Sequence, residues 1–147
     1  MQGDRVQPDA IQIILASAHS DDGDALQSLL TGSPWELIVV ANVADAIRAL
    51  HQITVPIVLC DQHLDGQPWQ ETIRALIKTR RRSSVTLLAD LGGPRLYAEV
   101  ARRGGFDLLE RPFDKEQVYA TLLCAYARGR TSWPLLSHRR VTAAVPA

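Results

Sequence analysis

Asp61 and Arg111 are the residues whose types and positions could most directly do chemistry. Asp61 follows the apolar run IVLC, and Arg111 lies two residues beyond a second run that ends at Leu109. A carboxylate exposed at the end of a strand can attack phosphorus as a covalent nucleophile, and it can also bind a divalent cation. A guanidinium beside it would pair with that carboxylate. Both roles require a fold that brings the two residues together.

Short apolar runs alternate with stretches of helical period along the chain, and this alternation predicts an α/β fold. Five strand-then-helix units imply right-handed crossovers, and therefore a parallel sheet with helices on both faces. In such a sheet, functional residues collect at the carboxyl ends of the strands. The predicted strands are 11–16, 37–40, 57–60, 85–89 and 106–109, and the predicted helices begin near 21, 43, 69, 96 and 115.

Length and charge limit the classes of protein that this chain can be. Its 147 residues suffice for one domain with a hydrophobic core, and its 16 basic and 16 acidic residues balance. The balance argues against direct nucleic-acid binding, and no helix-turn-helix follows the predicted sheet. No apolar run approaches the roughly 18 residues of a membrane span, and the amino terminus lacks a signal-peptide core, so we expect a cytoplasmic protein. We interpret 1–10 as a flexible N-terminus, 11–128 as the folded domain and 129–147 as a C-terminal tail.

The two cysteines, Cys60 and Cys124, each lie within an apolar stretch. We therefore expect both to be buried thiols in a reducing compartment rather than partners in a disulfide. No Cys/His spacing typical of a metal site is present.

Two stretches of the sequence resemble response-regulator receiver domains of two-component signalling. VLCDQHLDG is similar to the phosphoacceptor turn after their third strand, and YAEVARRGGFDLLERPFDKEQV is similar to their fourth helix, fifth strand and Lys-Pro-Phe turn. The resemblance covers about 11–128. It implies a flavodoxin-like, doubly wound sheet with strand order 2-1-3-4-5, Asp61 as the phosphoacceptor, a cis bond at Pro112, and a signalling rather than an enzymatic role.

The resemblance also implies a Mg²⁺ site that this chain has largely lost. Receiver domains hold the ion with an acidic pair after strand one, the phosphoacceptor and the backbone carbonyl two residues beyond it. These positions correspond to Ser17, Ala18, Asp61 and the carbonyl of His63. Because Ser17 and Ala18 carry no carboxylate, affinity for a hard cation should fall steeply, and Mg²⁺ is doubtful as a cofactor.

The remaining positions of the implied site depart as well. Ala89 stands where receivers carry a Ser or Thr that hydrogen-bonds the phosphoryl group, and Leu108 stands where an aromatic switch residue is expected. Arg111 replaces the usual lysine and keeps its charge with a different geometry. Asp21 and Asp22 lie near the missing pair, but we interpret them as first-turn acids that suit the helix dipole.

From these residues we expect a single-domain, atypical receiver that acts as a protein-interaction module in phosphorelay signalling, with Asp61 as the candidate phosphoacceptor. Its expected partners are a histidine kinase or another signalling protein. A homodimer is expected through the fourth helix, fifth strand and fifth helix, a face on which the sequence places Tyr97, Arg102, Arg103 and Tyr119.

Two alternatives remain at this point. A receiver-like adaptor or ligand-binding module that works without phosphorylation would explain the missing acidic pair and the missing hydroxyl at Ala89. A phosphohydrolase with Asp61 as its covalent nucleophile is disfavoured, because that chemistry needs a second acid two residues later and His63 stands there.

Overall fold

A five-stranded parallel sheet forms the centre of the structure, a computed structural model that describes residues 10–131. The strand order is β2-β1-β3-β4-β5, as predicted. The elements follow one another as β1 (Ile11–Ala16), α1 (Ser20–Leu30), β2 (Trp35–Val40), α2 (Val43–Gln52), β3 (Ile57–Asp61), the 3₁₀ turn η2 (Leu64–Gly66), α3 (Trp69–Thr79), β4 (Ser84–Ala89), α4 (Pro94–Arg102), β5 (Asp107–Glu110) and α5 (Lys115–Thr131).

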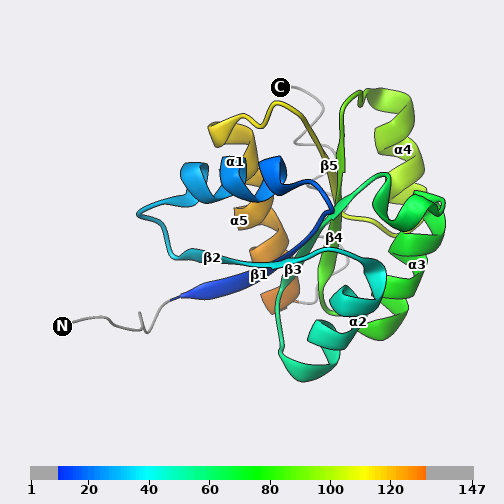
Figure 1. Ribbon diagram of the computed structural model, residues 1–147, viewed down its shortest axis with the longest axis horizontal. Coiled ribbons are helices and arrows are strands. Elements are labelled where there is room, and N and C mark those ends of the chain that lie inside the picture. The colour runs from blue at the N-terminus through cyan, green and yellow to red at the C-terminus, as the bar shows by residue number, and fades with distance from the viewer. Residues whose placement is uncertain (1–9, 132–147) are drawn as a thin grey trace.

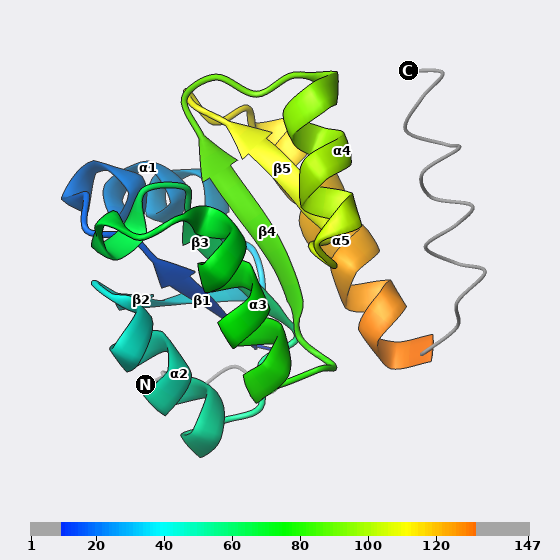
Figure 2. The ribbon, with the colours of Figure 1, turned by 90° about the vertical axis from the view of Figure 1, so that its right-hand side faces the viewer.

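Helices cover both faces of the sheet, which accounts for the continuous apolar character of the central strands. α1 and α5 lie on one face, and α2, α3 and α4 lie on the other (Figure 1; Figure 2 shows the second group in front of the sheet). Alternate residues of β1 enter the two cores: Ile13 and Leu15 pack toward α1 and α5, while Ile14 and Ala16 pack toward the opposite layer.

Two helices begin at side-chain caps. The carboxylate of Asp114 accepts a hydrogen bond from the Gln117 amide at 2.9 Å, and the Asn42 side chain accepts one from the Asp45 amide at 2.8 Å. α2 has a second cap from a distant segment, because Oδ2 of Asp65 accepts from the Val43 amide at 3.1 Å. The turn that follows β3 is therefore fastened to the start of α2.

Several boundaries differ from the predicted ones. β2 begins at Trp35, which pairs with Ile11 and is buried; the exposed Glu36 interrupts the apolar run from which 37–40 was predicted. α5 continues to Thr131, past position 128, at which the sequence analysis ended the folded domain. The rest of the predicted N-terminal segment and of the predicted C-terminal tail, residues 1–9 and 132–147, lies outside the described residues.

One cysteine prediction is wrong. Cys60 is buried in β3, as expected, but Cys124 is exposed. The apolar stretch around Cys124 belongs to α5, where the helical period turns Val118, Leu122 and Ala125 toward the sheet and leaves position 124 outward. Among the helices that the structure describes, none combines the length and the hydropathy needed to cross a bilayer.

Candidate functional site

The carboxyl ends of the strands bring the predicted site residues to one edge of the sheet. Asp61 is the last residue of β3, Ala89 is the last of β4, Ser17 directly follows β1, and Arg111 directly follows β5. Because β3 lies in the middle of the sheet, Asp61 is flanked by the neighbouring strands and is only 2% exposed. These residues therefore lie at the carboxyl edge of the sheet, where the sequence analysis expected them.

Arg111 is the centre of this site. Its Nη2 donates to Oδ1 of Asp61 at 2.5 Å and to Oδ2 of Asp22 at 2.7 Å, and its Nε donates to Oδ1 of Asp22 at 2.8 Å. Its Nη1 also reaches Oδ1 of the exposed Asp90 at 3.3 Å. The hydrogen bond to Asp22 raises the pKa of Arg111 above its ordinary value despite burial, so the side chain is a fixed cation.

Asp22 belongs to the site, although the sequence analysis assigned it to the helix dipole. The residue is 3% exposed and turned inward, and it accepts a hydrogen bond from the Ser17 hydroxyl at 2.7 Å in addition to those from Arg111. Burial alone would raise the pKa of Asp22, but the hydrogen bonds from Arg111 and Ser17 outweigh it and hold that pKa below its ordinary value. The signal that could have found it is the spacing of Asp22, Leu26 and Leu30, which share the buried face of α1.

Both carboxylate oxygens of Asp61 have partners. Oδ1 accepts from Arg111, and Oδ2 accepts from the His63 backbone amide at 3.2 Å. The Nε2 atom of His19, an exposed residue, lies 3.8 Å from Oδ2. Asp61 is thus a buried, hydrogen-bonded anion, whereas a carboxylate that attacks phosphorus must reach its substrate.

The residues present do not fit the Mg²⁺ ion that the resemblance implies. A hard cation needs several free oxygen ligands, but the inward oxygens of Asp22 and Asp61 are bonded to a guanidinium that is itself positive. The Ser17 hydroxyl donates a hydrogen bond to Asp22, the Ala18 side chain has no ligand atom, and the His63 carbonyl accepts from the Gly66 amide at 3.5 Å. Within residues 10–131, no group of three His, Cys, Asp or Glu side chains could hold a metal ion.

The other candidate positions, Ala89, Leu108 and Pro112, contribute backbone hydrogen bonds, core packing and backbone geometry. Ala89 is fully buried, and its carbonyl accepts from the Arg111 amide at 2.9 Å. Leu108 is buried in the core layer that includes Val100 of α4. The peptide bond before Pro112 is cis, as expected. The bond to Ala89 therefore holds the Arg111 backbone beside the end of β4, at the same edge of the sheet as Asp61.

A second contact fixes the loop between β4 and α4. The Gly92 amide donates to Oε2 of Glu110 at 2.5 Å, and a Cβ at position 92 would lie 2.8 Å from that side chain. Together with the contact from Arg111 to Asp90, this bond attaches the loop to the end of β5 through two successive residues. A side chain at position 92 would require the Glu110 side chain to move aside.

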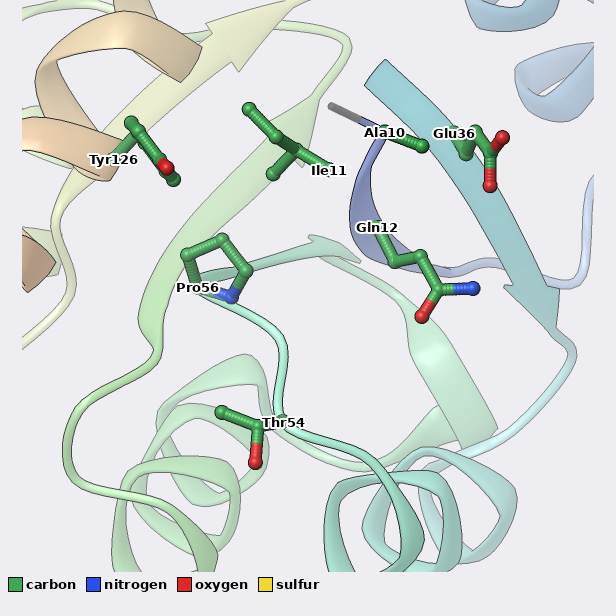
Figure 3. A pocket seen from close by; sticks show the side chains of 7 residues that line it. All are labelled: Ala10, Ile11, Gln12, Glu36, Thr54, Pro56 and Tyr126. Atoms are coloured by element: carbon green, nitrogen blue, oxygen red, sulfur yellow. The ribbon is translucent and has the colours of Figure 1, made fainter. Parts of the chain in front are cut away.

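A surface hollow lies at the other end of the sheet. It is formed around the amino ends of β1 and β2 and the segment that leads into β3 (Figure 3). Since the chemistry-bearing residues lie at the carboxyl ends of the strands, this hollow is separate from the site of Asp61. Its lining residues are Ala10, Ile11, Gln12, Glu36, Thr54, Pro56 and Tyr126.

Comparison with solved structures gives one fold, whereas comparison with protein sequences gives no match. Neither a protein-family model nor a curated protein matches the sequence. Among solved structures, the signal receiver domain of an HD domain-containing protein from Pseudomonas fluorescens Pf-5 is 18% identical, with a TM-score of 0.75 over 89% of this chain and 97% of that one.

Two further structures give the same result. A response regulator receiver domain protein from Clostridium thermocellum is 15% identical, with a TM-score of 0.73 over 84% of this chain and 99% of that one. A chemotaxis response regulator of Vibrio cholerae is 14% identical, with a TM-score of 0.69 over 79% of this chain and 98% of that one. The chain therefore has the fold of a response-regulator receiver domain, as the sequence resemblance implied.

Proposed function

We propose that this protein is a receiver-fold interaction module of bacterial two-component signalling, that it acts in the cytoplasm, and that its output is the binding of a partner protein rather than catalysis. The ion pair between Arg111 and Asp61, with 2.5 Å between Nη2 and Oδ1, carries this proposal. It uses the carboxylate at the phosphoacceptor position as an internal anchor.

The surroundings of Asp61 support binding without phosphorylation. Transfer of a phosphoryl group to a carboxylate needs an accessible oxygen and a cation free to neutralise the phosphoryl oxygens. Asp61 is 2% exposed and both its oxygens accept hydrogen bonds, while Arg111 is already shared between two buried carboxylates. No side-chain acid stands two residues beyond Asp61, where a phosphohydrolase would need one.

A second candidate is the phosphorylated receiver, with Asp61 as acceptor in a phosphorelay from a histidine kinase. The position of Asp61 favours it, because this residue ends the central strand at the edge where receivers are modified, with a positive side chain beside it. In this case the ion pair with Arg111 would have to open before phosphotransfer.

Intact mass spectrometry after incubation with phosphoramidate and Mg²⁺ separates the two candidates. We expect wild-type protein to remain unmodified. A variant with Ser17→Asp, Ala18→Asp, Ala89→Thr and Arg111→Lys should gain the mass of one phosphoryl group, because it restores the acidic pair, the hydroxyl and the lysine.

The matched control adds Asp61→Asn to the same variant and should abolish the adduct. An adduct on wild-type protein that Asp61→Asn removes would establish the phosphorylated receiver and refute binding without phosphorylation. A folded restored variant that gains no mass would count against the receiver assignment itself.

The face formed by α4, β5 and α5 is the proposed partner and homodimer surface. Tyr119, which the sequence analysis placed there, donates its hydroxyl to the Leu29 carbonyl of α1 at 3.1 Å, so it belongs to the packing of α1 on α5. Cys124 is a better probe: it lies one helical turn from Thr121, which bonds Asp107 of β5, and it is exposed. Sedimentation should show a dimer that Cys124→Asp weakens and that Ser28→Asp on α1 leaves intact.

A further inference from the structure

The site presents two buried carboxylates to a single internal cation. Asp22 and Asp61 come from different elements, α1 and β3, and are 3% and 2% exposed. Two carboxylates so close and so buried repel one another and lose much of their hydration, so the folded chain needs a positive charge between them.

Arg111 supplies that charge through one atom that touches both residues. Nη2 lies 2.7 Å from Oδ2 of Asp22 and 2.5 Å from Oδ1 of Asp61. Oxygen ligands lie about 2.0 to 2.6 Å from bound Mg²⁺ or Ca²⁺, so this nitrogen stands only slightly farther from the carboxylates than a divalent ion would. The guanidinium is weakly hydrated and always charged, which suits it to this buried position.

Ser17 completes the arrangement at a position where the resemblance places a carboxylate ligand. Its hydroxyl donates to Oδ2 of Asp22, the same oxygen that accepts from Nη2 of Arg111. A carboxylate at this point would add a third buried negative charge to Asp22 and Asp61, while the exposed Asp90 already takes part of the same guanidinium. A neutral donor instead adds a hydrogen bond to Asp22 and no charge.

We propose that the guanidinium of Arg111 takes the place of the divalent cation at this site, as a counterion that is part of the chain, so that the native protein binds no divalent ion between Asp22 and Asp61. The inference does not rest on the proposed function, since it concerns only which cation neutralises the two carboxylates. It accounts together for the loss of ligands at Ser17 and Ala18, the inward turn of Asp22 and the arginine at position 111.

Binding of Mn²⁺, which prefers carboxylate ligands, tests the proposal through the paramagnetic resonance signal of the free ion. Wild-type protein should show no Mn²⁺ binding that depends on Asp61, so wild type and Asp61→Asn should give the same signal. Arg111→Ala exposes both carboxylates to solvent and ions, and it should bind Mn²⁺ roughly tenfold more tightly than wild type, or better. The control variant, Arg111→Ala with Asp61→Asn, should lose most of this gain.

Arg111→Gln is the second variant, because it keeps a polar side chain at position 111 if Arg111→Ala fails to fold; circular dichroism verifies folding. Wild-type binding of Mn²⁺ that depends on Asp61 would overturn the proposal, since an ion would then sit beside the guanidinium. Folded Arg111→Ala or Arg111→Gln protein without any gain in Mn²⁺ binding would also overturn it. If both variants fail to fold, the wild-type measurement alone decides.

Discussion

Arg111 and Asp22, which stand 89 positions apart in the chain, form a bidentate ion pair beneath the carboxyl edge of the sheet, with Nε to Oδ1 at 2.8 Å and Nη2 to Oδ2 at 2.7 Å. Two parallel charge-assisted hydrogen bonds fix the orientation of the guanidinium. The remaining donors then point at Asp61 and Asp90. The ion pair with Asp22 therefore sets the orientation in which Arg111 donates hydrogen bonds to Asp61 and Asp90.

Substitutions within this cluster should destabilise the fold in a defined order. Arg111→Ala should lower the free energy of unfolding most, by about 3 kcal/mol or more, because it leaves two buried carboxylates without a cation. Asp22→Asn should rank second, since it weakens both bonds of the bidentate pair. Asp61→Asn should rank last, because asparagine still accepts from Arg111 and the repulsion between the two carboxylates disappears.

Urea unfolding followed by circular dichroism measures this order. Exposed Asp24 of α1 provides the matched control, and Asp24→Asn should change stability little. A larger loss for Asp61→Asn than for Asp22→Asn would contradict the view that Asp22 holds the guanidinium.

The contribution of Asp22 to stability should depend on acid pH. Its pKa in the folded protein is below the ordinary value of 3.8, so the unfolded chain takes up a proton first as the pH falls. The stabilisation is complete above pH 3.8 and is lost as the pH falls through the lower, folded value. The difference in unfolding free energy between wild type and Asp22→Asn should therefore be constant near neutral pH and shrink below pH 3.8.

Measuring both proteins across the same pH series cancels the titration of groups that they share, such as Glu99, whose pKa the hydrogen bonds from Arg102 and Arg103 also lower. A difference that persists undiminished well below pH 3.8 would show that the charge of Asp22 is not what stabilises the site.

The two cysteines should differ sharply in reactivity. Burial raises the pKa of Cys60 to about 12, with a further contribution from the carboxylates of Asp61 and Asp65, whereas Cys124 is exposed. A thiol reagent such as iodoacetamide at mildly alkaline pH should label Cys124 in the folded protein and Cys60 only after unfolding. Cys124→Ser should therefore leave the folded protein unlabelled, and rapid labelling of that variant would mean that β3 opens readily.

Much of the fold could be predicted because local patterns and the sheet topology agree. The run IVLC before Asp61 and the run before Arg111 are short, apolar and separated by helical periods, so both residues were expected at the same edge of a parallel sheet. The pairing of Asp61 with Arg111 follows from that geometry.

The role of Asp22 could not be predicted in the same way. An acid in the first turn of a helix has a sufficient local explanation in the helix dipole. The spacing of Asp22 with Leu26 and Leu30 indicates the buried face of α1, but it does not identify Arg111 as the partner, which the structure shows. The sequence also indicated that ligands for Mg²⁺ are missing at Ser17 and Ala18. It did not indicate which cation neutralises the two carboxylates instead, because that depends on the positions of side chains from three strands and one helix. The exposure of Cys124 was missed because the residues beside it in the sequence are apolar, whereas its position on α5 lies on the solvent-facing side of the helix.

The contact between Asp65 and the Val43 amide makes the start of α2 depend on a residue 22 positions later in the chain. A growing polypeptide that has emerged only as far as α2 would leave this amide without its native acceptor. The first turn of α2 is thus completed only when β3 and its following turn are in place. Exchange of the Val43 amide should consequently become faster when the turn behind Asp61 opens.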